Sequence, residues 1–434
     1  MSYRRSVPIA RRPVRAAAAC AVAALAVASC SPGGSDDTSP DATSSPGAAA
    51  TTSGVKSSPA GTDTSRSATH SSASRPGTSS TTAAAERSCV QRTYDRLTPA
   101  QRAGQLLMIG LDSNSAAGAD DALISAHHVG NVVYLGGWDG ASTVRSTSDH
   151  LQARASSSAT GGVGMLIAAD QEGGAVQQLR GPGFSSLLSA LRQGTMSSAT
   201  RTAYATTIGR QLKAAGVNLN LAPVADTVPA AMSASNAPIG KFAREYGHEP
   251  APVAAAVTDV VHGLDTGGVG ATVKHFPGLG RISGNTDYTS TGTTDTVTTA
   301  DDPYLRPFAA GMKAGAAAVM ISSARYAKLD ASTQATFSAA IISGLLRGKL
   351  GWHGVVITDD MNAVAVSGVP VGQRAVRFIA AGGDIVLTGQ ASDATPMIDA
   401  LMDRSDSDAK FASELKASVH RVLSLKHRLG LVRC

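Results

Sequence analysis

The chain has 434 residues, of which 43% are apolar and only 4% aromatic, and it carries 45 glycines and four cysteines. This length suits one large domain or two ordinary ones, and the composition excludes a small disulfide-stabilised scaffold. The first 29 residues hold five arginines and no acid, so their removal takes the formal charge from +6 to +1. A near-neutral net charge does not imply a basic face, and we therefore expect no nucleic-acid partner.

Residues 1–29 have the pattern of an export signal. An arginine-rich start is followed by the apolar run Ala16–Ala28, which is shorter than a membrane-spanning helix requires. The run ends in the letters VASC, which resemble a bacterial lipobox and would make Cys30 the lipidated first residue of the mature protein. The alternative is an ordinary secretory signal with an incidental cysteine, and Arg11-Arg12 leaves twin-arginine export open. We expect an exported protein, anchored by lipid on the extracellular face of the cell membrane.

Residues 30–88 consist mainly of Ser, Thr, Ala, Pro and Gly, with no aliphatic periodicity. Such a segment cannot bury enough apolar surface to offset the entropy lost on ordering. We predict a disordered tether over 30–88 that joins the lipid anchor to a folded domain at 89–434.

Two cysteines, Cys89 and Cys434, lie at the two ends of this folded domain. An exported protein meets oxidising conditions, so we predict a disulfide between them, with two free thiols as the alternative. Two cysteines this far apart in the sequence do not have the spacing of a metal site.

Short apolar segments alternate with helical ones along the domain. Strands are expected at 107–109, 132–135, 165–168, 219–222, 271–273, 318–321, 355–357 and 384–387. Helices are expected at 143–155, 198–215, 251–265, 303–314, 335–348, 370–381, 394–403 and 408–428. Eight strands alternating with helices predict an α/β fold with a single (β/α)8 TIM barrel, and an open doubly wound sheet is the alternative.

Polar residues follow five of the eight expected strands. They are Asp170 to Gly174, Asp226, Lys274-His275, Ser322 to Arg325, and Thr358 to Asp360. In a barrel the active site is built where strands end, so these groups are expected to converge on one rim. An aspartate at a strand end is also a common helix N-cap, and we expect that structural role for Asp226 and Asp360.

The motifs of several enzyme classes are missing from the sequence. It contains no GxxxxGK[ST] phosphate loop, no dinucleotide fingerprint, no GxSxG nucleophile elbow and no HExxH zinc motif. What remains at the rim is carboxylates beside Lys, His and Arg. This set suits the hydrolysis of an acetal, with one carboxylate as nucleophile and a proton donor across the bond.

Four motifs resemble those of glycoside hydrolase family 3, in particular its single-domain β-N-acetylglucosaminidases. They read ADQEGGAVQQL, NLNLAPVADTVP followed by NAPIGKFAREYG, KHFPGLGRISGNTD, and GVVITDDMNAVAV, and the resemblance covers nearly all of 89–434. It implies a retaining β-glycosidase that acts on terminal β-N-acetylglucosaminides. Together with the expected envelope location, it points to muropeptide fragments of the cell wall as substrate.

The resemblance also implies roles for individual residues. The family's nucleophile aligns with Asp359, and its residues that bind the non-reducing sugar align with Asp170, Arg244, Lys274 and His275. It implies a carbohydrate as the ligand and neither a metal nor an organic cofactor, and we expect a monomer.

The loop after the fifth strand departs from the family pattern. The family carries a second histidine where this chain has Leu279, and an Asp-Ser-His acid/base triplet where this chain has Asn285-Thr286-Asp287. The arginine that usually follows the Gly-Gly of the third-strand motif is Ala175, although Arg180 aligns with a later arginine.

Three interpretations of this loop remain open. Asp287 is the acid/base if its pKa is raised from about 3.9 by burial or by Asp359, and Asn285 is then consistent because no imidazolium needs a counter-ion. A second interpretation takes the acid from another loop, or restricts the enzyme to activated glycosides. The third is a catalytically inactive sugar-binding lipoprotein. A β-glucosidase or β-xylosidase of the same family is the enzymatic alternative.

Overall fold

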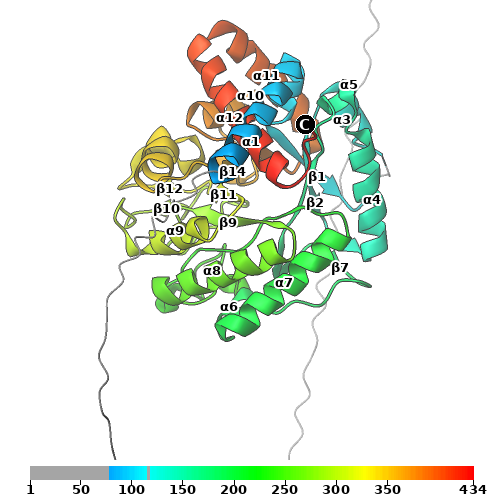
Figure 1. Ribbon diagram of the computed structural model, residues 1–434. Coiled ribbons are helices and arrows are strands. Elements are labelled where there is room, and N and C mark those ends of the chain that lie inside the picture. The colour runs from blue at the N-terminus through cyan, green and yellow to red at the C-terminus, as the bar shows by residue number, and fades with distance from the viewer. Residues whose placement is uncertain (1–77, 115–117) are drawn as a thin grey trace, which may run out of the picture. The chain divides into compact units, whose positions relative to one another are not determined.

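The computed structural model describes residues 78–114 and 118–434 (Figure 1). The expected signal peptide, the lipidation site Cys30 and most of the expected tether lie outside these residues. Helix α1 begins at Thr78, so residues 78–88, which we placed in the tether, are helical and the expected domain start at Cys89 lies inside a helix. None of the described helices combines the length and the apolarity needed to cross a membrane.

Eight parallel strands form the barrel, and their order around it follows the chain. They are β1 (Leu107–Asp112), β2 (Asn131–Leu135), β4 (Leu166–Ala169), β8 (Leu219–Asn220), β9 (Gly270–Phe276), β11 (Ala318–Ile321), β14 (Val355–Thr358) and β15 (Val386–Thr388). A parallel bridge between Ile357 and Ile385 joins the two ends of the sheet, and the Thr358 amide donates to the Ile385 carbonyl at 3.0 Å. The predicted barrel is therefore confirmed.

Helices surround these strands (Figure 1). They are α1 (Thr78–Arg96), α2 (Pro99–Gly104), α3 (Asp121–Ala126), α4 (Ala141–Arg154), α5 (Ser157–Thr160), α6 (Ala190–Gly194), α7 (Ser198–Ala214), α8 (Pro250–Thr266), α9 (Arg306–Lys313), α10 (Val371–Ala380), α11 (Ala394–Ser407) and α12 (Ala409–Arg428). In α8 the buried residues Val253, Val257, Val260 and Leu264 recur at helical spacing, which gives the helix one apolar face for the sheet.

The barrel also carries short strands and turns that the hydrophobic periodicity of the sequence did not predict. Three small sheets pair β3 (Trp138–Asp139) with β7 (Leu179–Arg180), β5 (Gln171–Gly173) with β6 (Val176–Gln177), and β10 (Thr294–Asp295) with β12 (Arg325–Tyr326) and β13 (Asp330–Gln334). Short 3-10 turns include η2 (Gly240–Phe242), η3 (Pro303–Leu305), η4 (Ala335–Phe337) and η6 (Val364–Val366). The helix expected at 335–348 is the turn η4 followed by a π-helix, η5 (Ala340–Lys349).

The last strand starts two residues later than expected, because Asp384 is engaged in ion pairs and a backbone hydrogen bond instead of strand pairing. Its buried carboxylate accepts from Arg347 and Arg421, each at 2.8 Å, and from the Val356 amide at 2.8 Å. One aspartate thus ties β14, η5 and α12 together where β15 begins.

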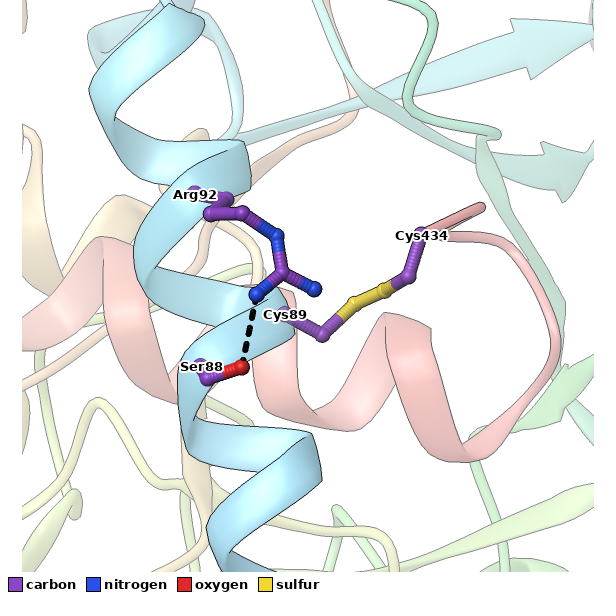
Figure 2. The surroundings of a disulfide bond; sticks show 4 residues. All are labelled: Ser88, Cys89, Arg92 and Cys434. Carbon is purple, nitrogen blue, oxygen red and sulfur yellow. Dashed lines mark hydrogen bonds between the residues drawn. A yellow bond between two sulfur atoms is a disulfide. The ribbon is translucent and has the colours of Figure 1, made fainter.

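A disulfide joins Cys89, on α1, to Cys434 at the end of the chain, as Figure 2 shows. The two Cα atoms are 5.6 Å apart across 345 residues of sequence. This is the pair that the sequence analysis expected, and Cys89 is buried where α1 meets the domain.

Replacing both cysteines by serine should lower the free energy of unfolding by about 2–5 kcal/mol, because the cross-link restricts the unfolded chain over a long loop. Urea denaturation of the C89S/C434S protein measures the loss. The wild-type protein under reducing conditions is the control and should unfold at the same urea concentration as the variant. Equal midpoints for oxidised wild type and variant would contradict a stabilising disulfide.

Candidate active site

The strand-end residues singled out in the sequence meet at one cavity of about 340 Å³. Strand β9 contributes Lys274 and His275, while Asp170 and Asp359 directly follow β4 and β14. Buried side chains from the barrel strands and from the segment after β8 close the floor, namely Val133, Leu221, Met320 and Leu387. The cavity therefore opens only toward the loops.

A buried network of two cations and two carboxylates forms one wall. The Lys274 Nζ atom lies 2.5 Å from a carboxylate oxygen of Asp170 and 2.5 Å from one of Glu172. Arg244 donates from Nε and Nη2 to the two oxygens of Glu172, each at 2.8 Å. Burial alone would raise the pKa of Glu172, but Arg244 and Lys274 outweigh burial and hold that pKa at about 2. Glu172 thus stays ionised and fixes both cations.

Glu172 is a site residue that the sequence analysis did not assign. The sequence did carry a signal for Glu172, because a glutamate that is buried close to a strand end needs cationic partners. Asp170, in contrast, is 19% exposed and faces the cavity, so it keeps acceptor capacity for a ligand hydroxyl. The network therefore contains one buried carboxylate, Glu172, which orients both cations, and one partly exposed carboxylate, Asp170, which faces the cavity.

Asp226 holds His275 in place and is not a helix cap. Its Oδ2 atom lies 2.7 Å from Nδ1 of His275, and Oδ1 accepts the Leu279 amide at 2.7 Å. With Nδ1 engaged, Nε2 of His275 lies toward Arg244, whose Nη2 is 3.5 Å away. The expected capping role of Asp226 is replaced by the positioning of a cavity residue.

Asp359 stands at the end of β14, where its amide donates to the Ile321 carbonyl at 2.9 Å. Burial raises the pKa of Asp359, while the nearby His275 and Lys274 oppose that rise. The next residue, Asp360, accepts from the amides of Asn362 and Gly389, each at 2.9 Å. Its hydrogen bonds therefore hold the loop together, but the helical turn that follows, η6, has Ala363 as its N-cap, so the helix-capping role expected for Asp360 is wrong.

The loop after β9 needs its glycines because it lies against backbone. A Cβ atom at Gly280 would lie 1.8 Å from the Thr227 carbonyl oxygen, and one at Gly284 would lie 2.0 Å from the carbonyl oxygen of Thr291. Neither contact is possible for another residue type without moving the backbone. The glycine-punctuated sequence therefore encodes a tightly seated loop.

This loop presents Asp287 at the cavity mouth. Asn285 Oδ1 accepts the Asp287 amide at 3.0 Å. The Val364 amide donates to the Asp287 carbonyl at 3.2 Å, and the Ala365 amide donates to Thr286 at 3.0 Å. The loop that carries Asp287 is thus bound to the segment that follows Asp359.

The environment of Asp287 suits a proton donor. Its side chain keeps an exposed edge at the mouth, but the surrounding cavity wall raises the pKa of Asp287, and the charge of Asp359 raises it further, to about 6. This is the perturbation that the first interpretation of the loop required.

The other departures from the family pattern also have a place. Leu279 and Ala175 line the cavity, while the exposed Arg180 donates to the Gln177 carbonyl at 2.7 Å and is not part of the lining. In the described part of the chain, metal-ligating side chains gather only at Cys89, His427 and Cys434, where both sulfur atoms belong to the disulfide.

Glu172→Gln should both destabilise the protein and weaken sugar binding. Removing the charge deprives the buried Lys274 and Arg244 of the carboxylate that binds both of them, and breaking a buried ion pair costs about 3–5 kcal/mol. Thermal unfolding and substrate titration measure the two effects. Gln178→Glu, at a polar position of the same cavity lining, is the control for a general sensitivity to charge. An unchanged melting temperature and KM would refute the orienting role of Glu172.

Comparison with known proteins agrees with this geometry. The family model "Glycosyl hydrolase family 3 N terminal domain" matches residues 99–425. A β-hexosaminidase of Xanthomonas campestris is 36% identical over 232 residues, which are 51% of this chain and 67% of that protein.

Two solved structures are similar over most of the barrel. The β-N-acetylhexosaminidase of Beutenbergia cavernae is 45% identical with a TM-score of 0.74, and the match covers 76% of this chain and 99% of that one. A family 3 β-N-acetylglucosaminidase of Paenibacillus is 31% identical with a TM-score of 0.68, covering 78% of this chain and 64% of that one. The chain belongs to glycoside hydrolase family 3.

Proposed function

We propose that the protein hydrolyses terminal β-N-acetylglucosaminides with retention, using Asp359 as nucleophile and Asp287 as acid/base. The observation that carries this proposal is the pair of carboxylates at one closed cavity. Both have a raised pKa, and hydrogen bonds tie the loop of one to the segment that follows the other. Two carboxylates that flank a scissile bond are the equipment of a retaining glycosidase.

In the first step the Asp359 carboxylate attacks the anomeric carbon, and Asp287 gives its proton to the departing glycosidic oxygen. In the second step the Asp287 carboxylate removes a proton from water, and this water displaces Asp359 from the sugar. Asp287 regains its proton and the β-configuration is restored. Asp170, Lys274, His275 and Arg244 hold the hydroxyl groups of the bound sugar.

The proposed substrate is a muropeptide fragment that ends in N-acetylglucosamine. The support is the hexosaminidase relatives, together with the sequence pattern of an exported lipoprotein anchored through Cys30. A protein tethered at the outer face of the membrane would meet fragments of the wall that surrounds it.

Alanine variants separate the two carboxylates. With 4-nitrophenyl N-acetyl-β-D-glucosaminide, Asp359→Ala should abolish turnover, whereas Asp287→Ala should lose about 10²- to 10⁴-fold in rate, the usual contribution of a general acid/base. Added azide should partly restore the Asp287 variant by forming the glycosyl azide, and it should not restore the Asp359 variant.

Turnover of the gluco- or xylo-analogue in preference to the N-acetyl substrate would move the enzyme to the β-glucosidase or β-xylosidase alternative. A wild-type protein as inert as both variants on all three glycosides would support the inactive sugar-binding alternative.

The protonation of Asp287 should determine how kcat/KM changes toward alkaline pH. Its pKa is raised to about 6, and it must be protonated to act as the acid, so kcat/KM should fall as the pH rises through about 6. Asp359 must be ionised, so activity should also fall toward acid pH. Measuring kcat/KM from pH 4 to 8 tests this, with Asp287→Asn expected to lose the alkaline limb. A wild-type profile that stays flat from pH 5 to 8 would exclude Asp287 as the acid.

A further inference from the structure

The leaving group of any substrate must lie outside the sugar cavity. Barrel side chains close the cavity floor, and the candidate acid stands at its mouth, so the glycosidic oxygen lies at the mouth beside Asp287. The group attached to that oxygen then contacts the loop surface next to Asp287.

Two apolar side chains are exposed at this position. Tyr288, the residue after Asp287, is 80% exposed and also lines the cavity, and Val364, whose amide bonds the Asp287 carbonyl, is 41% exposed. Exposed aromatic rings bind the apolar faces of sugar rings well because little side-chain entropy is lost on contact. Tyr288 therefore offers a platform for a second sugar.

Beyond this platform lies a second cavity of about 660 Å³, which we call the arginine pocket. Its walls are η6 and the residues after it, the end of the Asp287 loop from Ser290 to Thr294, and the small sheet β10-β12-β13. The amides of Val364 and Ala365, which line this pocket, donate to the carbonyls of Asp287 and Thr286, which line the sugar cavity. The two cavities are therefore neighbours on either side of this contact.

The charge of the arginine pocket is positive. Its lining holds Arg325 and Arg377, several hydroxyl side chains and Gln334, but no carboxylate. Neither arginine forms an ion pair with any residue in 78–114 or 118–434; Arg325 donates once, to the Ser332 carbonyl at 3.0 Å. The two acids on the same small sheet are engaged in other hydrogen bonds. Asp330 accepts from the hydroxyls of Ser332 and Ser338, and Asp295 accepts from the Val297 amide and the Thr298 hydroxyl.

We propose that the arginine pocket binds a carboxylate carried by the leaving group, with Tyr288 stacking on the sugar that bears it. Arginine recognises carboxylates through paired charge-assisted hydrogen bonds, and two guanidinium groups without acidic partners have that capacity free. This inference rests on the proposed function and goes further, because it assigns the recognition of an acidic leaving group to Arg325 and Arg377.

The test compares two substrates that differ only in charge. One is N-acetylglucosaminyl-β-1,4-N-acetylmuramyl dipeptide with free carboxylates, and the other is the same compound with its carboxylates methylated. The wild-type enzyme should prefer the free acid by about 10- to 100-fold in kcat/KM, which is the range expected for charge-assisted hydrogen bonds. The R325Q/R377Q variant should lose this preference and should hydrolyse the 4-nitrophenyl glycoside at the wild-type rate.

Arg210→Gln, at an exposed position on α7, is the matched control and should keep the preference. A wild-type enzyme that cleaves the 4-nitrophenyl glycoside but does not distinguish acid from ester overturns the inference and leaves the proposed function intact. The same holds if the double variant keeps the full preference. A wild-type enzyme that cleaves none of the three compounds refutes the proposed function itself, and with it the arginine pocket as a leaving-group site.

Discussion

The site depends on one constraint, which is that charges buried at the ends of barrel strands must neutralise one another. Lys274, Arg244, Glu172 and Asp170 meet this constraint as a group, because Glu172 binds both cations and leaves Asp170 facing the cavity. A lysine or arginine held on two sides cannot turn away from the ligand. The positions of these polar groups are thus set before any ligand binds, and less binding energy is lost in ordering them.

The loop after β9 differs from the family pattern at the positions that the resemblance assigns to the acid/base and its partner. The family places a histidine with an aspartate partner here, and this chain has Asp287 and Asn285 instead. An imidazolium needs a negative neighbour, whereas a carboxylic acid needs an environment that disfavours its charge. The cavity wall and Asp359 provide that environment, and Asn285 now contributes only a hydrogen bond to the Asp287 amide.

Much of this arrangement could be predicted from the sequence. The eight strands are visible because short apolar runs that end in polar residues recur at regular intervals, and all eight expected strands start within two residues of the observed ones. The glycine-rich motif and the family resemblance located Asp359, Lys274, His275, Asp170 and Arg244. The partners of Glu172 and of Asp226 were not predictable, because a pairing between residues 49 to 104 positions apart leaves no periodic trace. The small sheet that forms the arginine pocket was missed for the related reason that its strands are too short to alternate visibly.

The disulfide between Cys89 and Cys434 has a topological consequence. It closes nearly the whole described domain into a covalent ring, with the first helix and the last residue as its junction. A ring can be cut once anywhere along its length without falling apart into separate pieces. One proteolytic cleavage in an exposed loop would therefore leave both fragments covalently linked.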